Sequence, residues 1–349
     1  MGRDVLSVRQ MMVLLIVGLL APAVDLLPGI AARGVGRGGW LMGLGALPLL
    51  LAAQWAAAKV FGSGDICGRL GKPGGYTIII IYMVWIWVAL IAVFRLSAAR
   101  LENIYGVGPA ALLVAVLAAI SVRLGMGKAA ALARAAEIFY LALAVVAAGI
   151  LLMAVFKVEG RNLWPVEWTA VPGGSVAAVG LLLNGMPAAV LVKRVPKGNK
   201  SRGCGWMVAF CVTVTLLLAA VIGCVGPGLC GRLEMPFYIM VQGLGIKGAF
   251  QRTEALVAAL WLTSDLVLAS VLLRGWCDYV GEICSGVRGR WSALAVAALA
   301  LVGGWLLFPT GEDVRRFSGT ILPALGIGLG LTLPIFCVCF MKIREKKGG

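Results

Sequence analysis

The sequence predicts an all-α polytopic membrane protein with about ten transmembrane helices in a five-plus-five inverted repeat, in which helices 1 and 6 are broken. Three observations predict this fold class. Of the 349 residues, 61% are hydrophobic and 13% are charged, whereas a soluble chain has about 25% charged residues. The apolar residues form long runs bounded by charges or by Gly and Pro. The first run of each half is itself interrupted by Gly and Pro.

Each apolar run of about 20 residues is long enough to cross the membrane once. The expected spans are 7–30, 40–61, 75–96, 106–124, 129–156, 171–192, 205–225, 250–273, 291–308 and 319–341. They form one transmembrane domain over residues 1–349, with a first half at about 7–156 and a second half at about 171–341. Only short connections remain, so no separate catalytic domain is expected.

Basic residues indicate how the spans are oriented. The net charge is +16, with 31 Lys and Arg against 15 Asp and Glu. If the N-terminus is cytoplasmic, most of the basic residues fall in loops on the cytoplasmic side, as the positive-inside rule requires. An even number of spans then puts the C-terminus on the same side. Topology thus explains the charge, and no nucleic-acid partner is expected.

Several kinds of chemistry are excluded by what the sequence lacks. It contains no histidine, which excludes Ser/His/Asp catalysis and histidine sites for zinc or haem. No P-loop motif is present to bind nucleotide phosphates. The nine cysteines fall mostly in or beside apolar runs, where cysteine packs as a small hydrophobic residue. We therefore expect no enzymatic activity, no cofactor and no metal.

The interrupted first and sixth spans are the predicted ligand site, because an unwound stretch frees backbone groups to face a cavity. Aromatic residues of the third span are expected to wall the same pocket. The predicted ligand-binding residues are Gly18, Leu19, Ala21, Pro22, Tyr82, Trp85, Asn184 and Gly185. The alternative is that Gly and Pro are simply commoner in membrane helices than in soluble ones.

Polar residues inside the spans are the second functional signal, since a charge near the bilayer centre costs at least about 2.5–3.5 kcal/mol. Asp265 is expected in the inner half of the eighth span. Together with Thr263 and Ser264 it offers three oxygens on one helical turn, as a small cation or a proton would need. Two alternatives stay open: the hydroxyls bond back to their own helix, or Asp265 reaches Arg9 or Arg274 near the cytoplasm.

Five further charges are expected to serve gating or structure: Asp25, Arg134, Glu137, Arg252 and Glu254. Asp25 is placed in the outer third of the first span. Arg134 and Glu137 share a helix face and are expected to form a structural ion pair. Arg252 and Glu254 are two residues apart and do not face each other on a helix, so each is expected to pair with another element at the outer mouth.

A series of short motifs runs almost from end to end of the chain. They are Ser7-Val8-Arg9-Gln10 leading to Gly18 and Pro22, Gly39-Trp40, Leu70 to Tyr76, Arg95 to Arg100-Leu101-Glu102, Met235-Pro236-Phe237, and Gly248 to Leu256 followed by Trp261. In its order and spacing this series resembles the spore germination permeases, the membrane B subunits of nutrient-germinant receptors in the amino acid/polyamine/organocation transporter superfamily. The chain departs from that pattern at Gly108-Pro109, where Thr-Pro is common, and Asp25 and Asp265 are not part of it.

The resemblance implies a location in the inner membrane of a bacterial cell or spore, with an amino acid or similar small nutrient bound near the two broken helices. It also implies partners, namely a germinant-receptor A subunit with soluble domains and a lipoprotein C subunit, within the lipid bilayer. Two functions fit. The chain is either a receptor subunit that signals spore germination or an ion-coupled secondary amino-acid transporter. Both have the same fold, so the fold does not decide between them.

Overall fold

The computed structural model describes residues 4–62, 64–196, 203–244, 253–283 and 289–347, and these form helices and turns with no strand among them. Nine helices in this part of the chain are long and apolar enough to cross a membrane, and Trp291–Leu307 is a shorter apolar helix. The chain is therefore an all-α, multi-pass membrane protein, which confirms the predicted fold class. The inverted repeat remains a prediction.

Helices account for most of the described residues. Up to residue 155 they are α1 (Val8–Asp25), α2 (Leu27–Gly34), η1 (Gly36–Leu41), α3 (Met42–Phe61), α4 (Ile66–Leu70), α5 (Lys72–Tyr105), α6 (Val107–Gly125) and α7 (Ala129–Val155). After it they are η2 (Gly160–Asn162), α8 (Val171–Leu182), η3 (Leu183–Arg194), α9 (Gly203–Val225), α10 (Pro227–Cys230), α11 (Pro236–Leu244), α12 (Thr253–Ile283), α13 (Gly289–Leu307), α14 (Gly311–Leu325), the π-helical η5 (Gly326–Thr332) and α15 (Leu333–Lys347).

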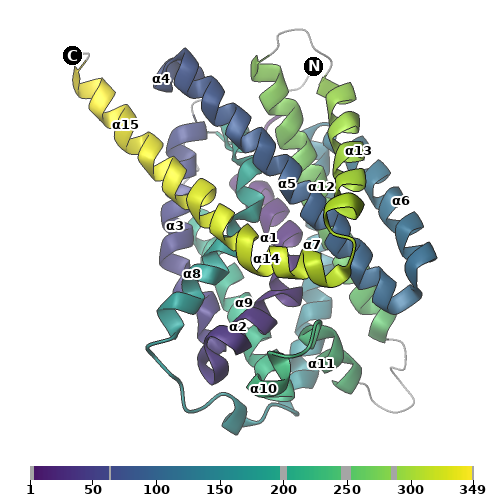
Figure 1. Cartoon of the computed structure of the whole chain (residues 1–349). Helices are drawn as coiled ribbons and strands as arrows, with labels where there is room; N and C mark the ends of the chain where they lie inside the picture. The colour runs from purple at the N-terminus through teal and green to yellow at the C-terminus, as the bar shows by residue number, and fades with distance from the viewer. Residues whose placement is uncertain (1–3, 63, 197–202, 245–252, 284–288, 348–349) are drawn as a thin grey trace.

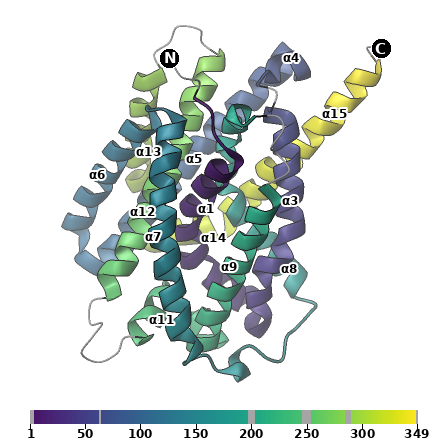
Figure 2. The same ribbon diagram turned by 180° about the vertical axis from the view of Figure 1, so that it is seen from behind.

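The long helices stand side by side as a bundle, with α1 and α12 in its interior and α2, α10 and α11 at one end (Figure 1). The segment that leads into α1 and the end of α15 both lie toward the other end, on different sides of the bundle (Figures 1 and 2). We call the end that holds α4 and the start of α1 the termini end, and the end that holds α10 the far end. Two termini at one end agree with an even number of crossings.

The first span is broken later than the sequence predicts. A capping box formed by Ser7 and Gln10 starts α1, which then runs without interruption through Gly18 and Pro22 to Asp25. The break comes at Leu26, before the short α2. Proline removes one backbone donor and so weakens the helix at one hydrogen bond, which a side chain from α12 repairs.

The sixth span changes helix type at its middle. Helix α8 ends at Leu182, and the twelve residues of η3 continue as a 3₁₀ helix. The Asn184 side chain donates from Nδ2 to the carbonyl of Leu181 at 2.8 Å, which turns this amide back on the last turn of α8. Such competition by asparagine for backbone groups disfavours a continuous α-helix, and Pro187 inside η3 has no donor to restore it.

The two most interior helices, α1 and α12, pack with almost no gap. A Cβ atom at Gly18 would lie 3.1 Å from the Cα of Leu268, so the contact requires glycine at this position of α1. A similar close contact joins the end of α8 to the α14–η5 junction, where a Cβ at Gly326 would clash with the carbonyl of Gly180. These two close backbone contacts hold α1 against α12 and α8 against α14, around one central region.

Candidate functional site

Four buried charges from four helices meet in this central region. Asp25 of α1 and Asp265 of α12 are both bound by Arg100 of α5, at 2.8 Å from Nε to Asp25 Oδ2 and at 2.5 Å from Nη1 to Asp265 Oδ2. Arg315 of α14 binds the other oxygen of Asp25 at 3.1 Å. The hydroxyl of Ser97 lies 2.5 Å from Asp265 Oδ2. We call these five residues the central charge network.

The central charge network is neutral and dry. Its two aspartates balance its two arginines, and the side chains of Asp25 and Arg100 are 0% and 2% exposed. Charges removed from water cost several kcal/mol each unless they are closely paired, so the four groups depend on one another. Ser97 and Arg100 stand one turn apart on one face of α5, which directs both toward Asp265. The aromatic ring of Trp261 lies 5.6 Å from the Arg100 guanidinium carbon and covers it.

Beside this network, the hydroxyl of Ser264 is inserted into α1. It donates to the carbonyl of Val17 at 2.6 Å and accepts from the backbone N–H of Ala21 at 2.8 Å. The carbonyl of Gly18, which loses its helical donor because Pro22 has no N–H, lies 3.2 Å from the same oxygen. A hydroxyl has one donor and two acceptor sites, and here α12 uses them to hold α1 straight. The Ala21 amide predicted to face a ligand is therefore already bonded.

Two cavities lie on opposite sides of the α8–η3 junction. The central cavity, of about 20 Å³, touches the central charge network and is lined by Pro22, Asn184, Arg100 and Asp265 among others. Most of its lining residues are apolar, and its volume is no larger than about one water molecule. The Asn184 Oδ1 atom is buried and has no hydrogen-bond partner among the described residues. This side of the junction thus combines an unused acceptor with fixed charges.

The second cavity, which we call the lateral cavity, is far larger, at about 790 Å³. It lies between α1, α3, α9 and the α8–η3 junction, and its walls are almost wholly apolar. Leu19 and Gly185 line it, whereas Pro22 and Asn184 line the central cavity. The predicted ligand residues of the two interrupted spans are therefore divided between two cavities.

Tyr82 and Trp85, the aromatic residues predicted to wall the ligand pocket, pack where α5 meets η5. The hydroxyl of Tyr82 donates to the carbonyl of Leu329 at 2.9 Å, and its ring packs edge to face on Phe61 and Trp85. Trp85 approaches Gly330 of η5, where a Cβ would lie 3.0 Å from the indole ring. Among the described residues that line the two cavities, neither Tyr82 nor Trp85 is present. They pack α5 against η5.

The three oxygens of the predicted cation site point to three different partners. The hydroxyl of Thr263 donates back to the carbonyl of Ala259 at 2.7 Å, Ser264 binds α1, and Asp265 binds Arg100 and Ser97. Asp265 lies in the first half of α12 and shares Arg100 with Asp25, and its place in the inner half of the membrane remains a prediction. Its charge is compensated by Arg100, a partner that neither sequence alternative named.

Among the predicted gating charges, Glu137 has a different partner from the one expected. It binds Arg9 at 2.9 Å, so the start of α1 replaces Arg134 as its partner and ties α1 to α7. Arg9, the second residue of α1, approaches Glu137 from another helix, so the geometry of α7 does not limit this contact as it limits an i,i+3 pair. Arg252 and the side chain of Glu254 lie outside the described residues, so their predicted pairing remains untested.

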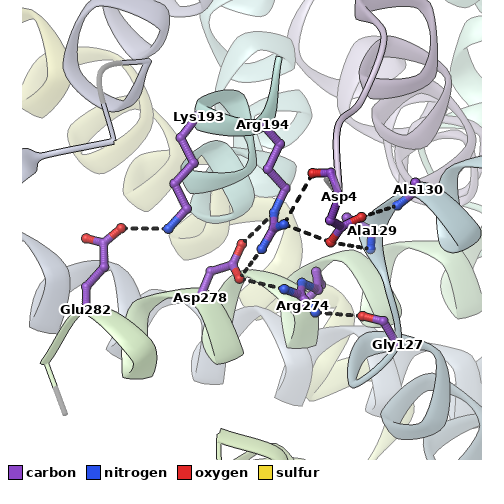
Figure 3. Close-up of polar contacts among 9 residues, drawn as sticks. All are labelled: Asp4, Gly127, Ala129, Ala130, Lys193, Arg194, Arg274, Asp278 and Glu282. Carbon is purple, nitrogen blue, oxygen red and sulfur yellow. Dashed lines mark hydrogen bonds and ion pairs between the residues drawn. The ribbon is translucent and has the colours of Figure 1, made fainter. Parts of the chain in front are cut away.

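A second charge network lies at the termini end (Figure 3). Arg194 of η3 binds Asp4 and Asp278, both at 2.7 Å, and Arg274 binds Asp278 at 2.8 Å. One helical turn further along α12, Glu282 binds Lys193 at 2.8 Å. We call Asp4, Arg194, Arg274 and Asp278 the termini charge network. It fastens the segment before α1 to the ends of η3 and α12.

Asp4 also closes the start of α7. Its two carboxylate oxygens accept from the backbone N–H groups of Ala129 and Ala130 at 3.1 and 2.9 Å (Figure 3). Partial burial acts to raise the pKa of this carboxyl, but the two amide hydrogen bonds and the nearby guanidinium groups of Arg194 and Arg274 outweigh it and lower the pKa below its ordinary value of 3.8. An anion at a helix N-terminus is favoured by the helix dipole.

The sequence analysis did not identify the two arginines that complete the central charge network, Arg100 and Arg315. Arg95 ends the predicted third span and Arg100 follows it, but α5 continues to Tyr105 and buries both of them. Arg315 precedes the predicted tenth span and lies on α14. The sequence does contain a sign that the helix continues, because the residues between Arg95 and Arg100 are all apolar or small. The hydropathy pattern alone marks that stretch as an outer loop.

The geometry describes a transporter-like membrane protein with a closed polar centre. Among the described residues, no group of three or more His, Cys, Asp or Glu side chains comes together to hold a metal ion. A scan against protein-family models and a search of curated proteins found no match. The function is therefore argued from the central region itself.

Proposed function

We propose that this chain is the permease-type membrane subunit of a spore nutrient-germinant receptor, which binds an amino acid or similar small nutrient and signals germination. It would lie in the inner membrane of the cell or spore with both termini in the cytoplasm. The resemblance of its motifs to spore germination permeases supports this proposal. So does the transporter-like arrangement of many apolar helices around a buried polar centre.

The observation that carries the proposal is the unpartnered Asn184 Oδ1 at the helix-type change, beside the central charge network. An amino acid carries an ammonium group, which is a donor, and a carboxylate, which is an acceptor. Asn184 offers the acceptor, and Arg100 offers guanidinium donors. In the conformation described, the central cavity of about 20 Å³ is too small for an amino acid, so a nutrient must part α8 from α14 to enter.

Such a site suits a receptor because a nutrient can bind in it only when α8 and α14 move apart. A ligand that fits the opened centre better than the closed centre shifts the population between the two, and no net transport is required. The resemblance implies that partner A and C subunits detect the shift. Since Arg100 and Arg315 together already compensate Asp25 and Asp265, a binding event here needs no accompanying cation.

The second candidate is the ion-coupled amino-acid transporter. One observation favours it, namely the meeting of two carboxylates where α1 contacts α12. If Arg100 moved away during a transport cycle, both carboxylates would require a cation or protons. This mechanism predicts flux that depends on pH or sodium, whereas the receptor predicts binding without that dependence.

A thermal-shift screen of the purified chain against the standard amino acids tests the proposed function. We expect one or a few of them to raise the melting temperature of the wild type and to have no effect on Asn184→Ala. The matched control is Asn103→Ala, an exposed asparagine of α5, which should respond like the wild type. If no amino acid stabilises the protein, or if Asn184→Ala responds normally, the assignment of the site fails.

Uptake by proteoliposomes separates the two functions. The receptor predicts ligand binding with no accumulation of radiolabelled amino acid, with or without a sodium or proton gradient. Accumulation that depends on such a gradient would replace the receptor by the transporter. Co-purification with A and C subunits is expected for the receptor.

A further inference from the structure

The lateral cavity is a long slot that starts at the termini end and runs toward the middle of the bundle. Along α1 it is lined from Val8 to Leu19, a distance of about 16 Å at 1.5 Å per residue. One leaflet of a bilayer has a hydrocarbon depth of about 15 Å, half of the usual 30 Å core. The slot therefore has the depth of one leaflet, and α1, which crosses the membrane, runs along its length.

The walls of this slot suit a hydrocarbon chain. Aliphatic, methionine and aromatic side chains from α1, α3 and α9 line it, together with the α8–η3 junction. Its volume of about 790 Å³ lies within the range of cavities that bind whole small molecules. Among the described residues that line it, none is acidic. A polar nutrient would leave these apolar walls unused.

The mouth of the slot carries an aromatic and two basic residues. Trp55 is 49% exposed, Lys59 is exposed one turn further along α3, and Arg69 of α4 lines the same cavity. The Arg69 guanidinium donates from Nη1 to the carbonyl of Lys59 at 2.6 Å, which holds the two basic residues together. Tryptophan and basic residues collect where a membrane protein passes from hydrocarbon to headgroups. The mouth is therefore at headgroup level.

We propose that the lateral cavity binds an anionic phospholipid, with an acyl tail inside the slot and the phosphate headgroup at Lys59 and Arg69. Apolar walls hold the tail, and the pair of positive charges selects a headgroup with net negative charge over a zwitterionic one. This proposal concerns a cavity different from the central one, and it holds whether or not the chain is a germinant receptor.

Native mass spectrometry of the purified full-length chain tests the proposal directly. The protein is mixed with phosphatidylglycerol and phosphatidylcholine that carry identical acyl chains, and the retained lipid molecules are counted. We expect the wild type to retain phosphatidylglycerol at least tenfold more than phosphatidylcholine. Lys59→Gln and Arg69→Gln should each reduce that preference about fivefold, since a basic residue near an anionic lipid contributes about 1 kcal/mol.

Two pairs of variants separate the slot from the rest of the surface. Ala58→Phe fills the slot from α3, whereas Ala52→Phe makes the same change on α3 away from it. Only Ala58→Phe should lose the retained lipid. Lys72→Gln removes a basic residue from the termini end outside the slot and should leave the lipid preference unchanged. Because Lys59→Gln changes an exposed side chain, it keeps the test valid if Ala58→Phe does not fold.

Three results would overturn the proposal. One is equal retention of the two lipids by the wild type. Another is full retention by Ala58→Phe, if that variant melts like the wild type. The third is that a free apolar amino acid such as leucine stabilises the wild type and Ala52→Phe but not Ala58→Phe, while lipid retention is the same in all three. That result would assign the slot to a soluble ligand.

Discussion

The central and termini charge networks have the same composition but differ in their access to water. Each joins two aspartates to two arginines, and each connects one end of α1 to α12. In the central network Asp25 and Arg100 are 0% and 2% exposed, whereas in the termini network Asp4 and Arg194 are 19% and 16% exposed. Asp4, Arg194 and Arg274 of the termini network keep partial access to water, although Asp278 is only 6% exposed, so this network can separate and re-form more easily than the charges of the central network, which must stay paired.

This difference indicates that the two ends of α1 have different roles, one fixed and one able to open. The central network fixes α1, α5, α12 and α14 in one arrangement. A ligand that enters the centre must supply enough binding free energy to disturb that arrangement. The termini network can open at small cost and so release the start of α1 from η3 and α12. Four variants test this contrast, from the largest expected effect to the smallest.

Removing Arg100 should have the largest effect. Arg100→Met leaves Asp25 and Asp265 buried with one cation fewer, which costs about 3–5 kcal/mol, so the variant should be recovered poorly from the membrane and melt far below the wild type. Arg316→Met, an exposed arginine of α14, is the control. Adding Asp25→Asn and Asp265→Asn to Arg100→Met should restore part of the stability. A fully stable Arg100→Met would mean that the network is not essential.

Removing the hydroxyl inserted into α1 should have the next largest effect. Ser264→Ala leaves the carbonyl of Val17 and the amide of Ala21 with weaker partners, at a cost of about 1–3 kcal/mol. Ser270→Ala is the matched control because the Ser270 hydroxyl bonds back to its own helix, to Leu266 at 2.6 Å. Thermal melting of the two variants in the same detergent compares them. Equal melting temperatures would show that α1 does not need the hydroxyl.

Neutralising the shared aspartate of the termini network should cost less and depend on salt. Asp278→Asn weakens the contacts with Arg194 and Arg274, and although Asp278 itself is 6% exposed, both arginines are 16% exposed and keep contact with water, so the loss should be about 1 kcal/mol. Raising the ionic strength screens such pairs, so the difference in melting temperature from the wild type should shrink in 1 M salt, at a Debye length of about 3 Å. A loss as large as that of Arg100→Met would remove the contrast between the networks.

The smallest effect should come from the charge of Asp4, and it should depend on pH. Because the folded protein lowers the pKa of this carboxyl below 3.8, Asp4 stabilises the fold above its ordinary pKa, and this contribution is lost as the pH falls through the lowered value. Asp4→Asn should therefore melt below the wild type at neutral pH and match it in strong acid. A difference that grows on acidification would contradict the sign of the shift.

The helices of this fold could be predicted from the sequence because the length and hydropathy of a run determine whether it can cross a membrane. The residues at which the helices end could not be predicted as well, because they depend on tertiary contacts. Helix α5 continues past the apolar run to Tyr105, since tertiary partners supply Arg95 with acceptors at the carbonyls of Phe308 and Pro309 at 2.8 and 3.1 Å. A one-dimensional pattern does not contain those partners.

The charged centre was predictable in part. Asp25 and Asp265 stand out because each interrupts an apolar run, but the sequence did not show that one arginine binds both. Arg100 reaches both carboxylates only because α5 lies beside α1 and α12 at this level of the bundle. Tyr82 and Trp85 were placed in the ligand pocket because aromatic residues often line one; their ring contacts with Phe61 and η5 became visible only once the helices were assembled.

The order in which the central charge network is synthesised has a consequence for biogenesis. Asp25 leaves the ribosome in the first helix and enters the bilayer long before Arg100 is made, so it must be held near the lipid surface or by the insertion machinery until α5 follows. Arg100 then balances Asp25 until Asp265 arrives with α12 and adds a second negative charge, which Arg315 balances when α14 follows. Nascent chains that end between α1 and α5, or between α12 and α14, carry one unbalanced intramembrane charge, which makes them natural targets for quality-control proteases.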